Sequence, residues 1–376
     1  MSSTDSAAHS KVAHAFVRYS DDLERRDPDE DALTDTIVRS LRLNNEWAAE
    51  KYKHAIRDAH AKGLGVMRGE LTVYPDLPAP FRQGMFATPA TYPVVIRLSS
   101  TAGAIRSDQV RGVRGMAVKV LGVDGERIVP GDGHHNQDFV LVNSDTFPFG
   151  DVRSYAVHGM RLAKILARTP DPILRLVCLF AQGASRIFPL IRVDLPDSLQ
   201  LFARPNHHIL GETYHSAAPL RYGDHVAKVS VAPLSNSVRC LTGQRISSAE
   251  GDDAHRASVE RFFERNSAEY EIRVQLCTDP EKMPVENATV RWPEEDSPHV
   301  PVARIRLPVQ DTSSDALRTY AEDVLSFNSW TGLAAHRPLG SINRLKLRVY
   351  NASSEFRHRV NGIDRREPTT VSDIPE

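Results

Sequence analysis

Cysteine is scarce in this chain of 376 residues, which has only Cys178, Cys240 and Cys277. The three lie far apart and no CxxC pair occurs, which argues against a disulfide scaffold and against a cysteine-rich zinc site. This cysteine usage suits a reducing compartment. The N-terminus has no basic stretch followed by an apolar one, so no secretion signal is indicated and we expect a cytoplasmic protein.

Other common signals are also missing. No uncharged apolar run approaches the ~20 residues that a membrane-spanning helix needs. The formal net charge of −1 provides no overall field to attract nucleic acid. No GxGxxG motif follows an expected strand and no GxxxxGK[ST] motif occurs, so dinucleotide-binding and P-loop folds are unsupported. Hydrophobic residues make up 41% of the chain and charged residues 25%, which is typical of a soluble globular protein.

The patterns that are present alternate between strand and helix. Short β-rich runs separated by turns stand at Glu70–Tyr74, Val94–Ser99, Gly115–Val120, Phe139–Val142, 225–232, 270–278 and 301–309. Helical periodicity is found at 31–62, 152–192, 249–268, 312–327 and 341–360. This layout predicts an α+β fold, in which an antiparallel β-barrel is wrapped by N-terminal, middle and C-terminal helices. We expect a flexible arm over 1–30, one folded domain over 31–362 and a disordered tail over 363–376.

The helix expected at 341–360 carries the most informative pattern. At about 100° per residue, one face holds Asn343, Lys346, Leu347, Tyr350, Ser353, Ser354 and Arg357. The phenol of Tyr350 would lie between two cations, which favour a phenolate that is able to bind iron. Periodicity alone, however, favours an ordinary amphipathic helix, in which Tyr350 packs in a core and forms a hydrogen bond through its hydroxyl.

A second pattern is the histidine His60, which precedes two glycines at a helix-to-strand junction. Its ordinary pKa suits proton transfer near neutral pH, although a solvent-facing histidine at a helix end is the simpler interpretation. Farther along, Arg97 and Ser99 share one face of an apolar strand. An arginine in such a strand needs a partner, and a buried carboxylate would serve.

A third pattern begins with the adjacent histidines His134 and His135. Neighbouring residues of a strand point to opposite faces, so we do not expect both to bind one metal ion. In a regular strand Asn136 would share a face with His134 and Asp138. A turn rich in hydrogen-bonding residues is the simpler interpretation.

Taken in order, the segments HAKGLG, VVIRLSS, RGMAVK, HNQDFVL and PLGSINR…VY…FRHR resemble those of haem catalases and their smaller catalase-related peroxidase relatives. The resemblance covers roughly 50–150 and 300–362, and it is thinner through 151–300. It implies a catalase-like β-barrel that binds haem b and decomposes peroxide. Tyrosine is the protein ligand of the haem iron in catalases.

The resemblance also implies a role for each matching residue. Catalytic positions fall on His60 as the distal acid and base, on Ser99, which orients it, and on Asn136, which contacts peroxide. Cofactor-binding positions fall on Arg57, Arg97, Phe147, Lys346, Tyr350 and Arg357. Of these, Tyr350 matches the iron ligand, the three arginines match propionate ligands and Phe147 matches an aromatic region that packs on the haem.

Two positions depart from the catalase pattern. Lys346 stands where large catalases have an arginine four residues before the iron ligand, and lysine lacks the planar fork that could hold a phenolate. Ala59 stands where catalases usually have valine and where the branch that rearranges fatty-acid hydroperoxides tends to have threonine. Alanine does not decide between the two branches.

Two alternative functions follow from these observations. The apolar, arginine-containing segment 152–192 could admit a fatty-acid hydroperoxide or contact a membrane surface, as in an allene oxide synthase-like enzyme or a lipid peroxidase. Its simpler interpretation is packing on the barrel or on another subunit, and we expect a homo-oligomer. A non-catalytic haem-binding protein is the second alternative, but the presence of His60, Ser99, Asn136 and Tyr350 together argues against it.

Overall fold

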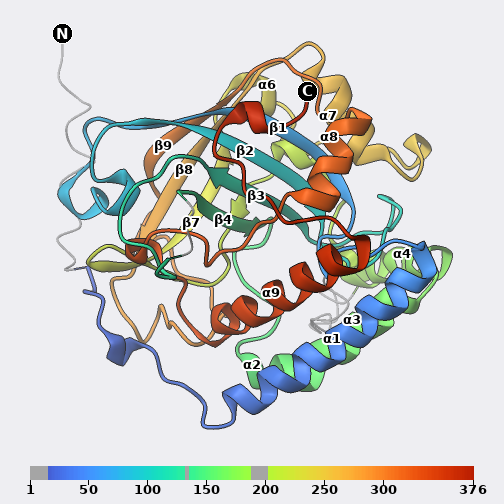
Figure 1. Cartoon of the computed structure of the whole chain (residues 1–376), viewed down its shortest axis with the longest axis horizontal. Helices are drawn as coiled ribbons and strands as arrows, with labels where there is room; N and C mark the ends of the chain where they lie inside the picture. Colours follow the sequence, from blue (N-terminus) through green and yellow to red (C-terminus); the bar gives the residue numbers. More distant parts are fainter. Residues whose placement is uncertain (1–15, 132–134, 188–201) are drawn as a thin grey trace.

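The computed structural model describes residues 16–131, 135–187 and 202–376, and its centre is an antiparallel sheet (Figure 1). The strands are β1 (Gly63–Val73), β2 (Thr91–Ser100), β3 (Arg114–Val120), β4 (Gln137–Val142), β5 (Tyr214–His215), β6 (Leu220–Tyr222), β7 (His225–Pro233), β8 (Ala268–Leu276) and β9 (Val300–Leu307). Their order is β5-β4-β3-β2-β1-β9-β8-β7-β6. Because β5 also pairs with β7, eight of the strands close into a barrel.

Alternation along the strands separates the barrel interior from its outer face. On β3, Met116 and Val118 belong to the main hydrophobic core, to which every barrel strand contributes. Gly115, Ala117 and Lys119 alternate with them and therefore face outward. This outer face of β3 and β4 is one wall of the cavity described below.

Helices cover the outside of the barrel. They are α1 (Glu30–Tyr52), α2 (Val152–Ser154), α3 (Met160–Arg168), α4 (Asp171–Ile187), α6 (Asn236–Arg239), α7 (Ala254–Phe263), α8 (Asp315–Thr319) and α9 (Ser341–Asn361). Figure 1 shows α1, α3, α4 and α9 on one side of the barrel and α7 and α8 near another. Across 16–131, 135–187 and 202–376, no helix is long and apolar enough to cross a membrane.

The predicted antiparallel barrel wrapped by helices is confirmed. The helix expected at 31–62 is shorter, because Lys53 adopts a left-handed conformation (φ 56°) and α1 ends at Tyr52. The chain then continues as an irregular segment to β1. This segment places Arg57 and His60 against the outer face of the barrel.

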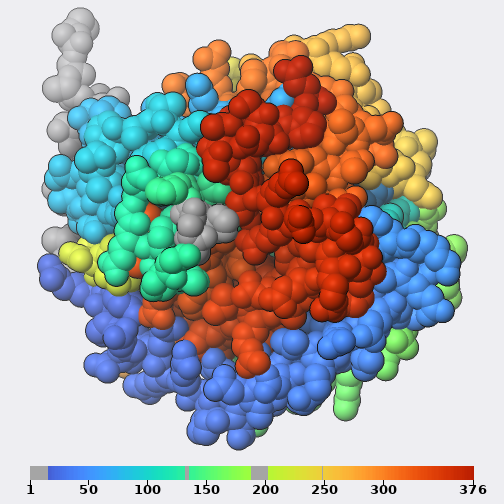
Figure 2. Space-filling model, viewed as in Figure 1, coloured from blue at the N-terminus to red at the C-terminus, as the bar shows by residue number. Residues whose placement is uncertain are grey.

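The C-terminal segment 363–376 differs from the disordered tail that we expected. It lies against the barrel, where Glu367 Oε2 is 2.7 Å from Nζ of the fully buried Lys119. Ile374 is only 2% exposed and belongs to a small hydrophobic cluster. The physical reason is the buried ammonium of Lys119, which needs carboxylates from both Asp138 and Glu367. C-terminal residues, red in Figure 2, occupy the centre of this face of the molecule.

The described part of the predicted arm, residues 16–30, also contacts the folded domain. The Val17 backbone N–H donates to the carbonyl of Cys277 at 2.8 Å. Glu24 Oε1 lies 2.6 Å from Nη1 of Arg344 on α9. Residues 1–15, His134 and the end of the 152–192 segment lie outside the described residues.

Candidate active site

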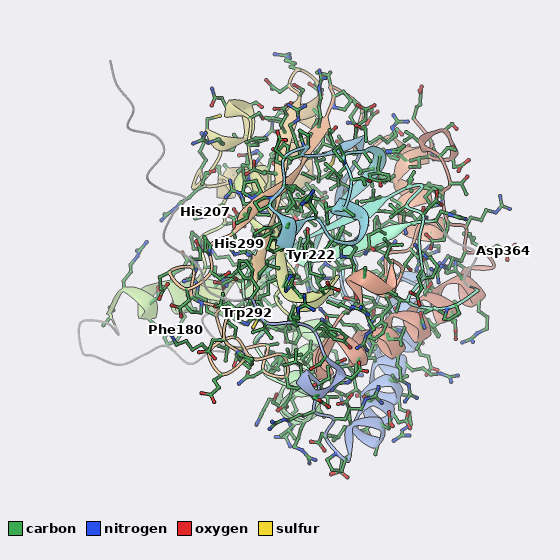
Figure 3. All side chains as sticks on the ribbon, turned by 90° about the vertical axis from the view of Figure 1, so that its left-hand side faces the viewer. Phe180, His207, Tyr222, Trp292, His299 and Asp364 are labelled. Carbon is green, nitrogen blue, oxygen red and sulfur yellow. The ribbon has the colours of Figure 1, made fainter. Side chains whose placement is uncertain are left out.

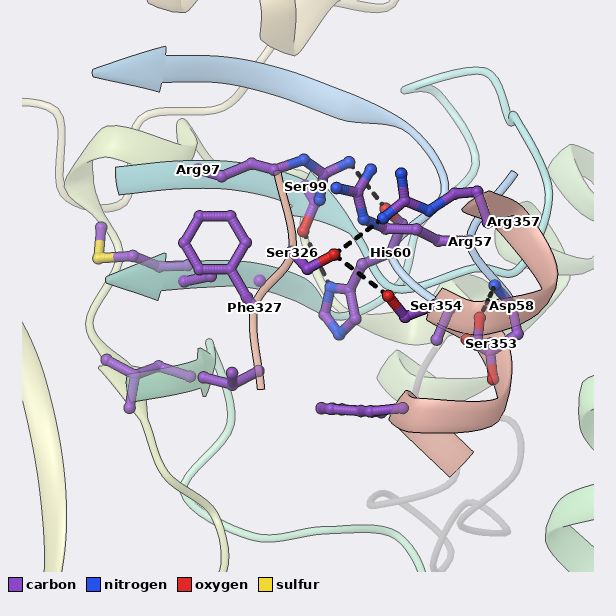
Figure 4. A pocket seen from close by; sticks show the side chains of 17 residues that line it. Arg57, Asp58, His60, Arg97, Ser99, Ser326, Phe327, Ser353, Ser354 and Arg357 are labelled. Atoms are coloured by element: carbon purple, nitrogen blue, oxygen red, sulfur yellow. Dashed lines mark hydrogen bonds between the residues drawn. The ribbon is translucent and has the colours of Figure 1, made fainter. Parts of the chain in front are cut away.

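A cavity lies between the outer face of the barrel and α9. Its walls come from the segment before β1, from β2, β3 and β4, from residues 326–327 and from α9. The cavity brings together six of the nine predicted site residues, which are Arg57, His60, Arg97, Ser99, Tyr350 and Arg357 (Figure 4).

His60 is held in place from several sides. Its Nδ1 lies 2.9 Å from Oγ of Ser99, and its backbone carbonyl accepts a hydrogen bond from Nη2 of Arg97 at 2.9 Å. The residue adopts a left-handed conformation (φ 57°), which is uncommon for a residue other than glycine. On β3, a Cβ at Gly115 would lie 2.5 Å from the imidazole ring, so only glycine leaves room for it there.

The surroundings of His60 keep its imidazole neutral. Burial and, to a smaller extent, the charges of Arg97, Lys346 and Arg57 lower the pKa of His60 to about 3. A neutral imidazole can accept a proton at neutral pH. For Nε2 to be the accepting atom, Nδ1 must carry the hydrogen and donate it to Ser99.

Three arginines meet around one carboxylate, that of Glu322. Arg57 Nη1 lies 2.6 Å from Oε2 of Glu322, and Arg97 Nη2 lies 2.9 Å from Oε1. Arg357 Nη1 donates to the backbone carbonyls of Glu322 and Asp323. Figure 4 shows the three arginine side chains together above His60.

This cluster carries an excess of positive charge. Burial raises the pKa of Glu322, but Arg97 and Arg57 more than offset it, so that the pKa lies below its ordinary value and the carboxylate is ionised. Burial and the neighbouring charge of Arg97 lower the pKa of Arg57. Arg57 and Arg97 contact the Glu322 carboxylate, and the negative charge of Asp323 also acts on Arg57 and Arg357. Three guanidinium groups thus have two carboxylates nearby, and the excess of positive charge is suited to binding further anionic groups.

Tyr350 lies on α9 and lines the same cavity. Burial raises its pKa, the negative charge of Asp58 raises it further, and no cation among the described residues offsets the rise. The expectation of a phenol between two activating cations is therefore wrong. Arg357 is occupied by backbone carbonyls, and Lys346 donates instead to Oδ1 of Asn343 at 3.2 Å.

The remaining predicted residues lie outside this cavity. Lys346 lines a smaller neighbouring cavity, which shares Val140 and Leu141 with the first. Burial lowers the pKa of Lys346 to about 8. Phe147 lies 6.0 Å from the Lys346 ammonium and packs against Tyr155. Phe147 therefore lies near Lys346 but does not line the main cavity.

Asn136 is on the predicted side of the sheet but at the wrong position along it. Val140 on β4 lines the cavity, and Asn136 lies four residues before it, about 13 Å away at strand spacing. Its amide is buried and donates to the carbonyl of Pro368 at 3.0 Å. The residue of β4 paired with Gly115, beside His60, is Val142. Among the described residues that line the cavity, none has an amide side chain.

Two residues that shape the site, Glu322 and Asp58, were not predicted from the sequence. Glu322 stands in a stretch expected to be helical, and only the predicted need of Arg97 for a buried carboxylate anticipated it. Asp58 lines the cavity between Arg57 and Ala59, and burial raises its pKa to about 6. Nothing in the sequence around Asp58 distinguishes it from a surface carboxylate.

Comparison with known proteins shows the fold. A fungal catalase matches with a TM-score of 0.56 and 17% identity over 83% of this chain and 62% of its own. Catalase A from Saccharomyces cerevisiae matches with a TM-score of 0.54 and 18% identity, over 84% of this chain and 65% of its own. A bacterial catalase matches with a TM-score of 0.53 and 16% identity, over 85% and 62%.

These likenesses define a catalase-like fold for this chain, which spans less than two thirds of the length of each of these catalases. No family model matches the sequence. No curated protein matches it either.

Proposed function

We propose that this chain is a haem-dependent oxidoreductase that decomposes peroxides, of the small catalase-related peroxidase kind. The observation that supports this most strongly is the single cavity lined by Tyr350, by a neutral His60 held by Ser99, and by three arginines. Peroxide would be the substrate and haem b the cofactor. The catalase-like fold supports the same proposal.

The residues present fit such a cofactor. Arg57, Arg97 and Arg357 supply more positive charge than Glu322 neutralises, which suits the two carboxylates of a haem. Tyr350 supplies an oxygen ligand of the kind that catalases use for iron. When bound, haem would supply a redox-active iron able to cleave the oxygen–oxygen bond of a peroxide. Because the Tyr350 pKa is raised, its loss of a proton must be coupled to iron binding.

Residues of the chain would transfer the proton between the two oxygens of the peroxide. Neutral His60 accepts a proton from the bound peroxide and returns it to the departing oxygen. Ser99 fixes the ring through Nδ1, and Arg97 fixes the backbone of His60 through its carbonyl. A well-placed acid and base of this kind contributes roughly 10²–10⁴ in rate. Val142, rather than an amide, is the β4 residue paired across from Gly115.

The test compares two substrates on the haem-loaded chain. Hydrogen peroxide turnover is followed by oxygen release, and turnover of a fatty-acid hydroperoxide is followed by loss of its diene absorbance. Oxygen release with hydrogen peroxide supports the catalase reaction, and turnover without oxygen supports a peroxidase. If neither peroxide is consumed although haem is bound, the proposed enzymatic function is wrong.

A second candidate, turnover of lipid hydroperoxides at a membrane surface, is favoured by the outer face of α4. Large apolar side chains are exposed there, including Leu176 at 67%, Leu179 at 65% and Phe180 at 64%. Phe180 lies at the edge of the molecule, whereas Tyr222 lies within it (Figure 3). Ile173 and Ile187 extend the same exposed stripe at helical spacing.

Basic residues accompany this stripe. Residues 152–187 contain six lysines and arginines and one aspartate. Arg161, Lys164 and Arg186 are exposed and have no carboxylate within 4 Å among the described residues. An apolar stripe on α4 with unpaired cations on α4 and on the neighbouring α3 suits an anionic membrane surface. Sedimentation with vesicles of anionic phospholipid tests this, with Leu176→Glu as the variant expected to stay in solution. If the wild-type chain stays in solution and self-associates, the apolar stripe instead forms a contact with a second copy of this chain.

A further inference from the structure

Glu322 lies on the one-turn π-helix Tyr320–Val324, which follows α8 directly. Such turns often mark functional positions within helices. Both of its carboxylate oxygens are used, Oε1 by Arg97 and Oε2 by Arg57 and Arg97. The Glu322 side chain is nevertheless 36% exposed, so part of it already contacts solvent.

The turn that carries Glu322 also uses up most of the arginine hydrogens. Arg57 donates through Nη1 to Glu322, and through Nη2 to the carbonyls of Ala321 and Leu325. Arg357 donates through Nη1 and Nη2 to carbonyls and the hydroxyl of residues 322–326. Of five N–H donors in each guanidinium, only the Nε–H of Arg57 and of Arg357 has no partner among the described residues.

Arg97 is used less completely. Its Nη2 serves Glu322 and the His60 carbonyl, while Nη1 has no partner among the described residues. A carboxylate entering the cavity would therefore meet one available Nη group and two single N–H donors. It could gain a bidentate guanidinium only by taking donors from Glu322 or from the carbonyls of the same turn.

Gly63 makes the position of Glu322 possible. A Cβ at residue 63 would lie 2.3 Å from Oε1 of Glu322, a distance at which the carboxylate would have to move. Because Gly63, the glycine of the HAKG segment, has no side chain, it leaves the space that the Glu322 carboxylate occupies. A single methyl group there would displace the carboxylate and leave its charge on the chain.

We propose that Glu322 is an internal competitor for the carboxylates of the incoming cofactor, and that it stabilises the arginine cluster until they displace it. The proposal rests on the proposed function, since it concerns binding of haem by this cavity. Glu322 would thus take part in cofactor loading, and Gly63 would leave the room that the Glu322 carboxylate needs beside the arginines.

The experiment titrates haem into the cofactor-free full-length chain and follows the Soret absorbance. Glu322→Gln is expected to tighten haem binding roughly 10- to 100-fold, the effect of removing one charged hydrogen-bonding competitor. It is also expected to lower the thermal midpoint of the cofactor-free chain, because Arg57 and Arg97 lose their carboxylate partner. Haem dimethyl ester, which has no free carboxylates, should bind both chains with affinities within about twofold.

Asp315→Asn is the matched control, since it removes one carboxylate that is 96% exposed on the adjoining α8. It should leave haem affinity unchanged. Gly63→Ala provides a second route, because it expels the carboxylate sterically and should also tighten haem binding. Unchanged or weaker haem binding in both Glu322→Gln and Gly63→Ala would overturn the competitor role. Absence of a Soret band with every chain and both porphyrins would instead overturn the proposed function.

Discussion

At the arginine end of the cavity, Arg57 and Arg97 share the carboxylate of Glu322, and the peptide carbonyl of His60 is held by Arg97. On the side of α9, Tyr350 lies near Asp58, and the ammonium of Lys346, which lines the neighbouring cavity, donates to an amide. Neither Asp58 nor Lys346 has an ion-pair partner within 4 Å among the described residues. Similar burial thus gives one end with paired charges and one end with unpaired charges.

The difference shows that the arginine end holds its side chains in position through contacts within the chain. Paired charges hold the histidine and the arginines in position before any ligand arrives. At the tyrosine end, buried groups shift their pKa values instead: burial raises that of Asp58 to about 6 and lowers that of Lys346 to about 8. The tyrosine end therefore depends on its ligand for charge balance.

The largest effect is expected from removing the hydroxyl at the unpaired end. Tyr350→Phe should lower haem affinity by more than the 10- to 100-fold that loss of an outer-sphere partner of a metal costs, because the proposed iron ligand is removed. Soret titration measures this, with Tyr155→Phe as the control at a neighbouring buried phenol. Full haem binding by Tyr350→Phe would show that the iron ligand lies elsewhere.

At the paired end, His60→Gln should reduce peroxide turnover by roughly 10²–10⁴ while haem affinity stays near that of the wild type. The side chain loses its proton acceptor, but Arg97 can still hold the backbone carbonyl of residue 60. Steady-state oxygen release and Soret titration on the same samples separate the two effects. An equal loss of haem binding would mean that His60 organises the cavity rather than moving the proton.

Lys346→Met should stabilise the cofactor-free chain by about 1–3 kcal/mol at pH 7, because it removes a buried ammonium without a carboxylate partner. The folded pKa of about 8 lies below the unfolded value of 10.5. The wild type should therefore regain stability relative to the variant as pH rises from 8 to 10.5. Denaturant unfolding at several pH values tests this, with the exposed Lys164→Met as the control. No gain in stability would show that Lys346 is well solvated or paired.

The smallest effect concerns the pH dependence of stability at His60. Its folded pKa of about 3 lies below the ordinary 6.5, so the unfolded chain binds more protons between these values. Stability from this group is complete above pH 6.5 and falls as pH drops toward 3, by up to about 1.4 kcal/mol per unit. His60→Gln should remove this contribution from the unfolding free energy measured between pH 7 and 5. Parallel pH profiles of the two chains would contradict a neutral, buried imidazole.

Much of the fold was predictable because strand and helix periodicities are local. Seven of the barrel strands and the helix that begins at Ser341 follow from local periodicity, whereas the two-residue β5 (Tyr214–His215), which closes the barrel, was not predicted. The tail was not predictable from its polar composition. Its order depends on the buried Lys119, which stands far from it in the sequence.

The sequence predicted which residue types line the cavity, but it did not predict which groups their side chains contact. Arg57, His60, Arg97, Ser99, Tyr350 and Arg357 meet in one cavity as the family resemblance implied. Periodicity placed Asn136 on the outward face of the sheet, but only the register of β3 and β4 shows that Val142 is the residue paired with Gly115. Likewise, Lys346 shares the helix face of Tyr350, yet its ammonium donates to Asn343.

The most direct test of the central claim, that this cavity binds haem between Tyr350 and the arginine cluster, is a Soret titration of the full-length chain combined with thermal unfolding. We predict saturation at one haem per chain and a midpoint that rises with haem concentration, as expected for a ligand that binds only the folded state. Absorbance that never saturates, with an unchanged unfolding midpoint, would contradict the account.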